Sequence, residues 1–212
     1  TLHYGQTHSK EIDAASAIAK KLGLIHKIID VSFFKELAWY SALTSPDKFD
    51  VPPDRDVDEM AATIPVTYVP LRNTFFMTMA AAYLESEILH HIEGEGGLPS
   101  EVEASLFIAA NAVDYSGYPD CRPEFYDSVR ESLKLGSKIG TQYDIPFDVQ
   151  IPLIALSKAE IAQLSIDIGA PTELTWSCYL GGETPCGTCD SCVLRANGFA
   201  DAGLKDPALP SQ

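Results

Sequence analysis

Basic side chains are scarce in this sequence. Of its 212 residues, 15 are Lys or Arg and 30 are Asp or Glu, so the formal charge at neutral pH is −15. A general nucleic-acid-binding protein neutralises phosphates with a basic face, so this balance argues against direct binding of nucleic acid. It stays compatible with one anionic small molecule in a locally positive cleft.

Long apolar runs are also absent. The longest candidate, Thr74 to Leu84, is too short for a membrane-spanning helix, which needs about 20 predominantly apolar residues. No signal peptide is visible, so we expect a cytoplasmic protein without a membrane partner. A hydrophobic fraction of 46% with 21% charged residues is that of an ordinary globular chain and excludes global disorder.

Helix-like and strand-like segments alternate along the chain. Apolar residues recur at helical spacing from Ile12 to Leu22, and Gly23 is suited to end that helix. Ser157 and Glu160 have the spacing of a capping box. This alternation favours a parallel sheet covered by helices, with ligands beyond the carboxyl ends of the strands. The expected helices cover residues 8–22, 32–40, 73–90, 123–140 and 157–168, and the expected strands cover 1–4, 25–29 (buried), 105–110 and 147–151.

Four of the five cysteines lie within 15 residues near the C-terminus, in the pattern C-x7-C-x2-C-x2-C. Neighbouring glycines allow tight turns, and four thiolates at this spacing suit one tetrahedral zinc ion. Such a site has no open position, so we expect it to be structural. Two disulfides or an iron–sulfur cluster are the alternatives. The expected ligands are Cys178, Cys186, Cys189 and Cys192, whereas Cys121 alone is more typical of a buried small residue than of a nucleophile.

A loop with two tyrosines follows the expected strand 105–110. Tyr115 and Tyr118 offer faces on which a planar heterocycle can stack. The carboxylates of Asp114 and Asp120 can accept hydrogen bonds from the N–H and amino edge of a guanine-like base. An ordinary polar loop with a Tyr-Pro turn explains the composition equally well.

Three cationic residues are candidates for binding an anion. Lys158 lies in the first turn of an expected helix, where a cation opposes the helix dipole unless an anion docks there too. A solvated lysine is the alternative. Arg72 opens another expected helix, and Arg195 follows the last clustered cysteine by three residues, within reach of the same cleft.

These features follow one another in a recognisable order. Along the chain come Tyr4-Gly5-Gln6-x-His8-x-x-Glu11, Val69-Pro70-x-Arg72-Asn73, the loop from Asp114 to Arg122, Pro152-Leu153, Ser157-Lys158-x-Glu160 and the cysteine cluster followed by Arg195. This order closely resembles the QueC family, the 7-cyano-7-deazaguanine synthases of the queuosine pathway. The resemblance runs from residue 1 to about residue 200 and is broken mainly by an acidic, glycine-rich insertion over residues 93–103.

The resemblance implies a fold and a reaction. The fold is a doubly wound parallel α/β sheet, adenine nucleotide alpha hydrolase-like and Rossmann-like, with a nucleotide-binding domain over 1–175 and a zinc-binding C-terminal segment over 176–212. The reaction converts 7-carboxy-7-deazaguanine and ammonia to the nitrile through an adenylated carboxylate and an amide. ATP with Mg²⁺ is the co-substrate, zinc is structural, and the enzyme acts on small molecules as a homodimer.

The roles of individual residues are inferred from the chemistry of this reaction and are not carried by the motifs themselves. Cations stabilise the charge that develops on phosphate during adenylation. The expected catalytic residues are Arg72, Lys158 and Arg195; the expected cofactor-binding residues are His8, Arg72 and Lys158; the expected substrate-binding residues are Asp114, Tyr115, Ser116, Tyr118, Asp120, Cys121 and Arg122.

Two departures from the family pattern lead to further expectations. Leu71 stands where the family has a small residue, and leucine is a poor choice if the backbone there has positive φ. The family's first strand and its Ser-Gly-Gly-x-Asp-Ser loop, which cradles the ATP pyrophosphate, have no match, since Thr1 corresponds to the strand that follows them. We therefore expect either a segment upstream or a sheet interrupted between strands 1–4 and 105–110. The alternative functions are another adenylating enzyme, such as a tRNA-thiolating relative, and a non-catalytic zinc-bearing protein that binds a deazapurine or a partner without ATP turnover.

Overall fold

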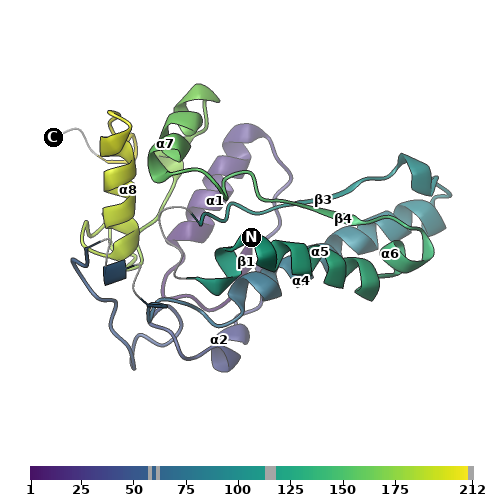
Figure 1. The fold of residues 1–212 in the computed structure, drawn as a ribbon, viewed down its shortest axis with the longest axis horizontal. Helices are drawn as coiled ribbons and strands as arrows, with labels where there is room; N and C mark the ends of the chain where they lie inside the picture. Colours follow the sequence, from purple (N-terminus) through teal and green to yellow (C-terminus); the bar gives the residue numbers. More distant parts are fainter. Residues whose placement is uncertain (57–58, 61–62, 113–117, 210–212) are drawn as a thin grey trace. The chain divides into compact units, whose positions relative to one another are not determined.

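The chain is an α/β protein with short parallel strands, as seen in a computed structural model (Figure 1). The structure describes residues 1–56, 59–60, 63–112 and 118–209. The chain divides into two units, one formed by Thr1–Pro70 with Leu156–Gln212 and the other by Leu71–Ala155. In the part of the chain that is described, no helix combines the length and apolar character needed to cross a bilayer.

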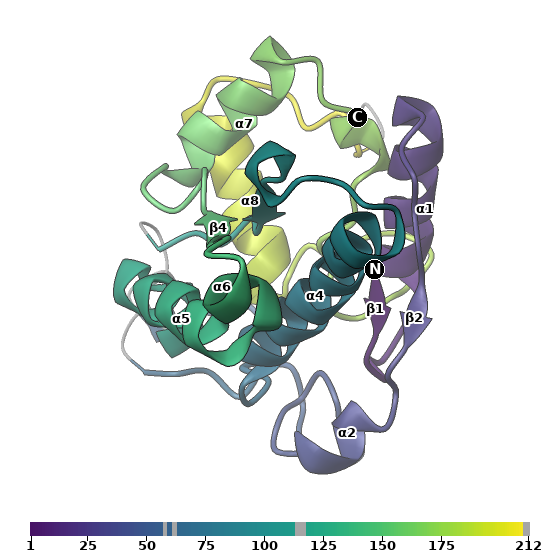
Figure 2. The same ribbon diagram turned by 90° about the vertical axis from the view of Figure 1, so that its right-hand side faces the viewer.

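The first unit contains a two-stranded parallel sheet. Strand β1 (Leu2–His3) pairs with β2 (Ile29–Asp30), and Figure 2 shows the two strands side by side next to helix α1 (Lys10–Leu22). Helix α1 confirms the expected helix, and Gly23 ends it in the left-handed conformation with φ 66°. The unit also holds α2 (Phe34–Leu37), α7 (Lys158–Asp167), the 3-10 helix η4 (Thr172–Leu174) and α8 (Asp190–Asp201).

Two expectations for the first unit are wrong. The strand expected over 25–29 is not a buried strand, because β2 contains only Ile29 and Asp30, both exposed, and Ile25 is almost fully exposed. The position of β2 is set by its two-residue pairing with β1 and not by the apolar character of residues 25–29. The helix expected over 32–40 is reduced to the four residues of α2, and Ser32 instead donates its N–H to Asp30 Oδ1 at 2.8 Å.

The second unit packs helices against one face of a second parallel pair. Strands β3 (Ala104–Phe107) and β4 (Phe147–Gln150) alternate buried and exposed residues, and Leu106 lies opposite Val149. The buried face joins one core with side chains from the helices, including Tyr126 and Ile139. The helices of this unit are α4 (Arg72–Leu89), the π-helix η1 (His90–Gly94), the 3-10 helices η2 (Pro99–Glu101) and η3 (Pro119–Cys121), α5 (Pro123–Gly136) and α6 (Lys138–Gln142).

The helix expected over 123–140 is in fact two helices. Ser137 has extended backbone angles, φ −113° and ψ 153°, and its Oγ accepts a hydrogen bond from Gly140 N at 3.0 Å. Ser137 therefore begins α6 as its N-cap, directly after α5 ends at Gly136. The residues of the insertion are largely exposed, as expected, and Glu93 pairs with Lys138 and accepts from the Tyr143 hydroxyl.

Parallel pairing is confirmed in both sheets, but among the described residues each sheet has two strands, and β1 and β3 belong to different sheets. The doubly wound arrangement therefore stays a prediction. The division of the sequence at residue 175 stays a prediction as well.

Leu71, at the start of α4, has the positive φ that leucine tolerates poorly. Its φ is 55° and its ψ is 21°, and the side chain is 64% exposed. A non-glycine residue in the left-handed region costs roughly 1–2 kcal/mol. We expect Leu71→Gly to raise the free energy of unfolding by about 1 kcal/mol, measured by urea denaturation.

A matched control for Leu71→Gly is Leu135→Gly. Leu135 is similarly exposed, at 66%, but it lies in the regular helix α5. Glycine in a helix is destabilising by about 1 kcal/mol relative to good helix formers, so this variant should lose stability. Equal losses in both variants would contradict the strain at Leu71.

Candidate functional site

The four clustered cysteines converge as the spacing predicts. The sulfur atoms of Cys178, Cys186, Cys189 and Cys192 all lie within 4.8 Å of one another. Three of the four residues are buried, and none of the five cysteines, all of which the structure describes, forms a disulfide. A tetrahedral zinc with Zn–S bonds of about 2.3 Å holds its sulfurs about 3.8 Å apart, and Cys186 Sγ lies 3.9 Å from Cys192 Sγ.

Main-chain N–H groups point at two of these sulfurs. Cys178 Sγ accepts from Leu180 N and Cys186 N, each at 3.4 Å, and Cys186 Sγ accepts from Thr188 N at 3.4 Å and Cys189 N at 3.3 Å. Burial raises the pKa of Cys186, but the hydrogen bonds from Thr188 and Cys189 outweigh it and lower the pKa to about 6. Such donors favour the thiolate form that a metal needs, so the donor set fits structural zinc.

At two other sulfurs of the cluster burial outweighs the hydrogen bonds, so the net shift in pKa is upward. Burial thus raises the pKa values of Cys189 and Cys192. A bound cation would stabilise these thiolates, which the protein alone disfavours.

The cysteine cluster also binds a loop that is distant in sequence. Pro53 forms an antiparallel bridge with Cys189, and Asp54 N donates to Thr188 O at 2.8 Å. Arg55 forms a two-pronged ion pair with Asp190, with Nε 3.1 Å from Oδ1 and both side chains largely buried. The loop that contains residues 53–55 is therefore attached to the cysteine segment.

His8, an expected cofactor ligand, lies against the cysteine segment. Its Nε2 is 3.1 Å from Cys178 O, and its ring meets the Trp176 ring edge-on at 6.4 Å between centroids. Gly181 has φ +63°, and a Cβ there would lie 2.3 Å from the His8 ring, so glycine is required on both counts. The cofactor role of His8 stays a prediction.

Arg195 is held by a buried ion pair. Its guanidinium bonds both carboxylate oxygens of Asp206, with Nη2 2.8 Å from Oδ1, and Nη1 donates to Thr175 Oγ1 at 2.8 Å and Ser177 Oγ at 3.2 Å. Burial raises the pKa of Asp206, but the hydrogen bonds from Arg195 and Ala208 N outweigh it and lower the pKa below its usual value. This geometry gives Arg195 a structural task, and its catalytic role stays a prediction.

Lys158 is the first residue of α7 and lies between the two residues of the expected capping box, which the structure confirms. Ser157 Oγ accepts from Glu160 N at 3.2 Å, and Glu160 Oε2 accepts from Ser157 N at 2.8 Å. The backbone of Lys158 packs against Gly198 of α8. The capping box thus fixes the turn that carries Lys158.

The tyrosine loop is described only in part. Asp114, Tyr115 and Ser116 lie outside the described residues. In the remainder, Arg122 is exposed, Tyr118 and Cys121 are half-buried, and Asp120 is buried.

Asp120 joins two motifs that are far apart in sequence. Its Oδ2 accepts from Asn73 N at 3.3 Å, and Asn73 Nδ2 lies 3.7 Å from Cys121 Sγ. The Val-Pro-x-Arg-Asn motif and the Tyr-Pro-Asp-Cys-Arg motif therefore meet at the start of α4. No local sequence pattern points to a role for Asn73 or for Tyr126, whose hydroxyl donates to Asp120 O at 2.9 Å.

The buried carboxyl of Asp120 predicts a dependence of stability on pH. Burial raises its pKa, while the hydrogen bond from Asn73 and the charge of Arg72 oppose that shift without cancelling it. In the unfolded chain this carboxyl loses its proton as the pH rises above about 4, whereas in the folded chain it keeps the proton to a higher pH. The free energy of unfolding therefore falls as the pH rises, until the pKa of the folded state is passed. Asp120→Asn keeps an oxygen for Asn73 N without the charge, so we expect its stability relative to the wild type to increase with pH across that window.

The pH prediction is measured by urea denaturation between pH 4 and pH 8. Asp127→Asn is the control, since Asp127 is exposed and pairs with Arg130 across one helical turn. A difference between the Asp120 variant and the wild type that does not change with pH would contradict the prediction.

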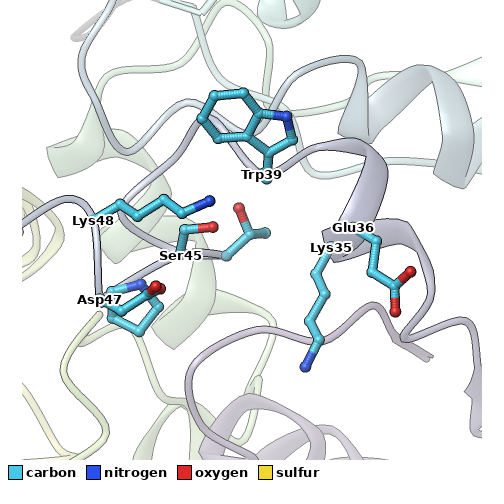
Figure 3. A pocket seen from close by; sticks show the side chains of 8 residues that line it. Lys35, Glu36, Trp39, Ser45, Asp47 and Lys48 are labelled. Atoms are coloured by element: carbon cyan, nitrogen blue, oxygen red, sulfur yellow. The ribbon is translucent and has the colours of Figure 1, made fainter.

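A shallow surface depression of about 480 Å³ lies beside α2 (Figure 3). Lys48 and Ser45 point into it below the Trp39 ring, and Lys48 Nζ lies 4.6 Å from the centroid of that ring. The lining offers two ammonium groups, from Lys35 and Lys48, but also the carboxylates of Glu36 and Asp47. Because these charges balance, the depression by itself identifies no ligand.

Comparison with known proteins agrees with the motifs. The family model of the queuosine biosynthesis protein QueC matches residues 1–203. The 7-cyano-7-deazaguanine synthase of Thermoplasma acidophilum is 44% identical over 204 residues, which are 96% of this chain and 77% of the relative. The proteins of the same name from Thermoplasma volcanium and Trichodesmium erythraeum are 46% and 42% identical, over 96% and 97% of this chain and 76% and 85% of their own lengths. The chain therefore belongs to the QueC family, a family of ligase-type enzymes in queuosine biosynthesis.

Proposed function

We propose that this protein makes 7-cyano-7-deazaguanine from 7-carboxy-7-deazaguanine and ammonia, with ATP and Mg²⁺. The observation that carries the proposal is the similarity, at 42–46% identity over 96–97% of this chain, to three proteins named 7-cyano-7-deazaguanine synthase. The arrangement of the described part of the tyrosine loop supports it. Asp120 is turned inward, while Arg122 and part of Tyr118 stay accessible to a planar base.

The chemistry needs two activations. A carboxylate resists ammonia until one of its oxygens becomes a leaving group, and transfer of AMP from ATP supplies that group and releases pyrophosphate. Ammonia displaces AMP and leaves the amide. A second ATP adenylates the amide oxygen, and loss of AMP with the remaining N–H protons gives the nitrile. Two ATP are therefore consumed for each nitrile formed.

We assign contacts with the ATP phosphates to Arg72 and Lys158. Arg72 is the first residue of α4 and Lys158 is the first residue of α7, where the helix dipole also favours an anion. Mg²⁺ and these cations stabilise charge on the phosphates as the carboxylate attacks. His8 stays a candidate contact to ATP. Arg195 supports the cysteine segment. A catalytic contribution from Arg195 requires its ion pair with Asp206 to open.

Three further features belong to this proposal. They are a cytoplasmic enzyme, a homodimer, and a division into a nucleotide-binding domain over 1–175 and a zinc segment over 176–212. Light scattering on the purified protein measures the oligomeric state, and a mass of one chain would contradict the dimer.

The test of the reaction is turnover by the purified protein. It is incubated with 7-carboxy-7-deazaguanine, MgATP and ¹⁵N-ammonium, and mass spectrometry follows the nitrile. We expect one ¹⁵N in each nitrile and two AMP released. Lys158→Gln should lower kcat/KM for ATP about 100-fold, as loss of one charge-stabilising group does. Lys134→Gln, which changes an exposed lysine of α5, should leave kcat/KM unchanged.

The same experiment separates the alternatives. Binding of the deazaguanine without ATP turnover would favour the non-catalytic zinc-bearing protein. Release of AMP with a different acceptor would favour another adenylating enzyme.

A further inference from the structure

The first turn of α4 receives its cap from another segment. The first N–H groups of a helix have no partner inside the helix, and an N-cap side chain normally accepts from one of them. Leu71, the residue at the N-cap of α4, has no side-chain oxygen. Asp120 takes over this task, since its Oδ2 accepts from Asn73 N at 3.3 Å.

The main-chain carbonyl of Asp120 is a second point at which α4 and α5 contact the loop. It accepts from the Tyr126 hydroxyl at 2.9 Å and from Asn73 Nδ2 at 3.3 Å. A carbonyl oxygen has two lone pairs, so both are in use. Tyr126 is 0% exposed, Asn73 7% and Asp120 6%, so removal of either donor leaves a buried acceptor short of a partner. Side chains from α4 and α5 therefore fix one peptide group of the loop.

This peptide group lies in the middle of a tight turn. Pro119–Cys121 forms the 3-10 helix η3, and Cys121 N donates to Tyr118 O at 3.1 Å. Asp120 points into the protein, whereas Arg122 is exposed and Tyr118 is partly exposed. Fixing Asp120 thus also fixes the direction in which its two outward neighbours leave the turn.

We infer that Asn73 and Tyr126 are positioning residues, which hold Asp120 so that Tyr118 and Arg122 face the deazaguanine. In this arrangement Asp120 is the anchor of the loop rather than a group that touches substrate. The inference rests on the proposed function for the identity of the ligand. It adds two residues that act on substrate affinity without contacting the substrate.

The test removes one hydroxyl and follows two substrates. Tyr126→Phe keeps the buried ring and deletes only the bond to Asp120 O. We expect KM for 7-carboxy-7-deazaguanine to rise about 10-fold, the typical effect of losing one buried hydrogen bond, while KM for ATP stays unchanged. Amide hydrogen exchange at Cys121 should become faster, because its N–H closes the turn that Tyr126 holds.

Tyr143→Phe is the matched control. It deletes the same group, but from a hydroxyl that bonds to Glu93 at the surface, and it should leave both KM values unchanged. Asn73→Ala is the second variant, should Tyr126→Phe lose its fold, and it should show the same selective rise in KM. An unchanged KM for the deazaguanine, or an equal rise in both KM values, would overturn the inference. If the wild type forms no nitrile, the proposed reaction fails, and the Kd for the deazaguanine then replaces KM in the same comparison.

Discussion

Removal of the metal from the four-cysteine cluster is expected to unfold the segment around it and to lower the melting temperature of the protein sharply. The cluster lies at the start of α8, since Cys189 precedes its first residue and Cys192 lies in its first turn. Without a cation, buried thiolates repel one another or must take up protons. Structural zinc contributes roughly 10–16 kcal/mol of binding free energy in small zinc peptides, so a loss of several kcal/mol is expected here.

The consequences of metal removal can be located as well as measured. Trp176 Nε1 donates to Cys178 O at 2.9 Å, so the fluorescence of this tryptophan should shift when a chelator is added. The loop that carries Pro53 and Arg55 should become sensitive to protease, because its partners Cys189 and Asp190 lose their order. Elemental analysis should find one zinc per chain in the untreated protein.

Two cysteine variants give the control. Cys192→Ser should abolish stoichiometric zinc, whereas Cys121→Ala should retain it, because Cys121 lies outside the cluster. A metal-free protein as stable as the untreated one would contradict a structural role. Visible absorption with iron in place of zinc would instead favour an iron–sulfur cluster.

The parts of the site that the sequence predicted are the local ones. The four cysteines are spaced so that short turns alone bring the sulfurs together, and Ser157 and Glu160 lie one helical turn apart. Leu71 was recognisable as unsuitable for positive φ because a family pattern marks that position as small. The cysteine cluster and the capping box each depend on residues within about 15 positions of one another.

The parts that the sequence did not predict depend on distant partners. Asp120 caps α4 across 47 residues, and Arg55 pairs with Asp190 across 135, so no local pattern points to either contact. The displaced strand β2 has the same cause, since its register is set by β1. The break between α5 and α6 is different, because Gly136 and Ser137 are a local stop and start signal that the apolar periodicity of the segment concealed.

Replacement of Gly198 by leucine is expected to destabilise the protein by roughly 3 kcal/mol, as overpacking of a tight contact does. Helices α7 and α8 lie side by side (Figure 1), and even a Cβ at Gly198 would lie 2.7 Å from Lys158 Cβ and 3.1 Å from Lys158 O. Because a backbone atom is among these neighbours, side-chain rotation alone cannot relieve the clash. Gly198→Ala should give a smaller loss, since alanine regains up to about 1 kcal/mol of helix propensity.

Gly136→Ala is the control for this contact. Gly136 is also helical, but among the described residues a Cβ added there meets nothing within 4 Å beyond its chain neighbours and its own helix backbone, so alanine should be neutral or stabilising by up to about 1 kcal/mol. Urea denaturation measures both variants, and a Gly198→Leu protein as stable as the wild type would show that the two helices are not in tight contact. The milder variant bears on function, because a displaced α7 moves Lys158. A Gly198→Ala protein that retains its zinc but has a raised KM for ATP would indicate that α8 sets the position of Lys158. Because the cysteine cluster orders α8, this result would connect the structural metal to nucleotide binding.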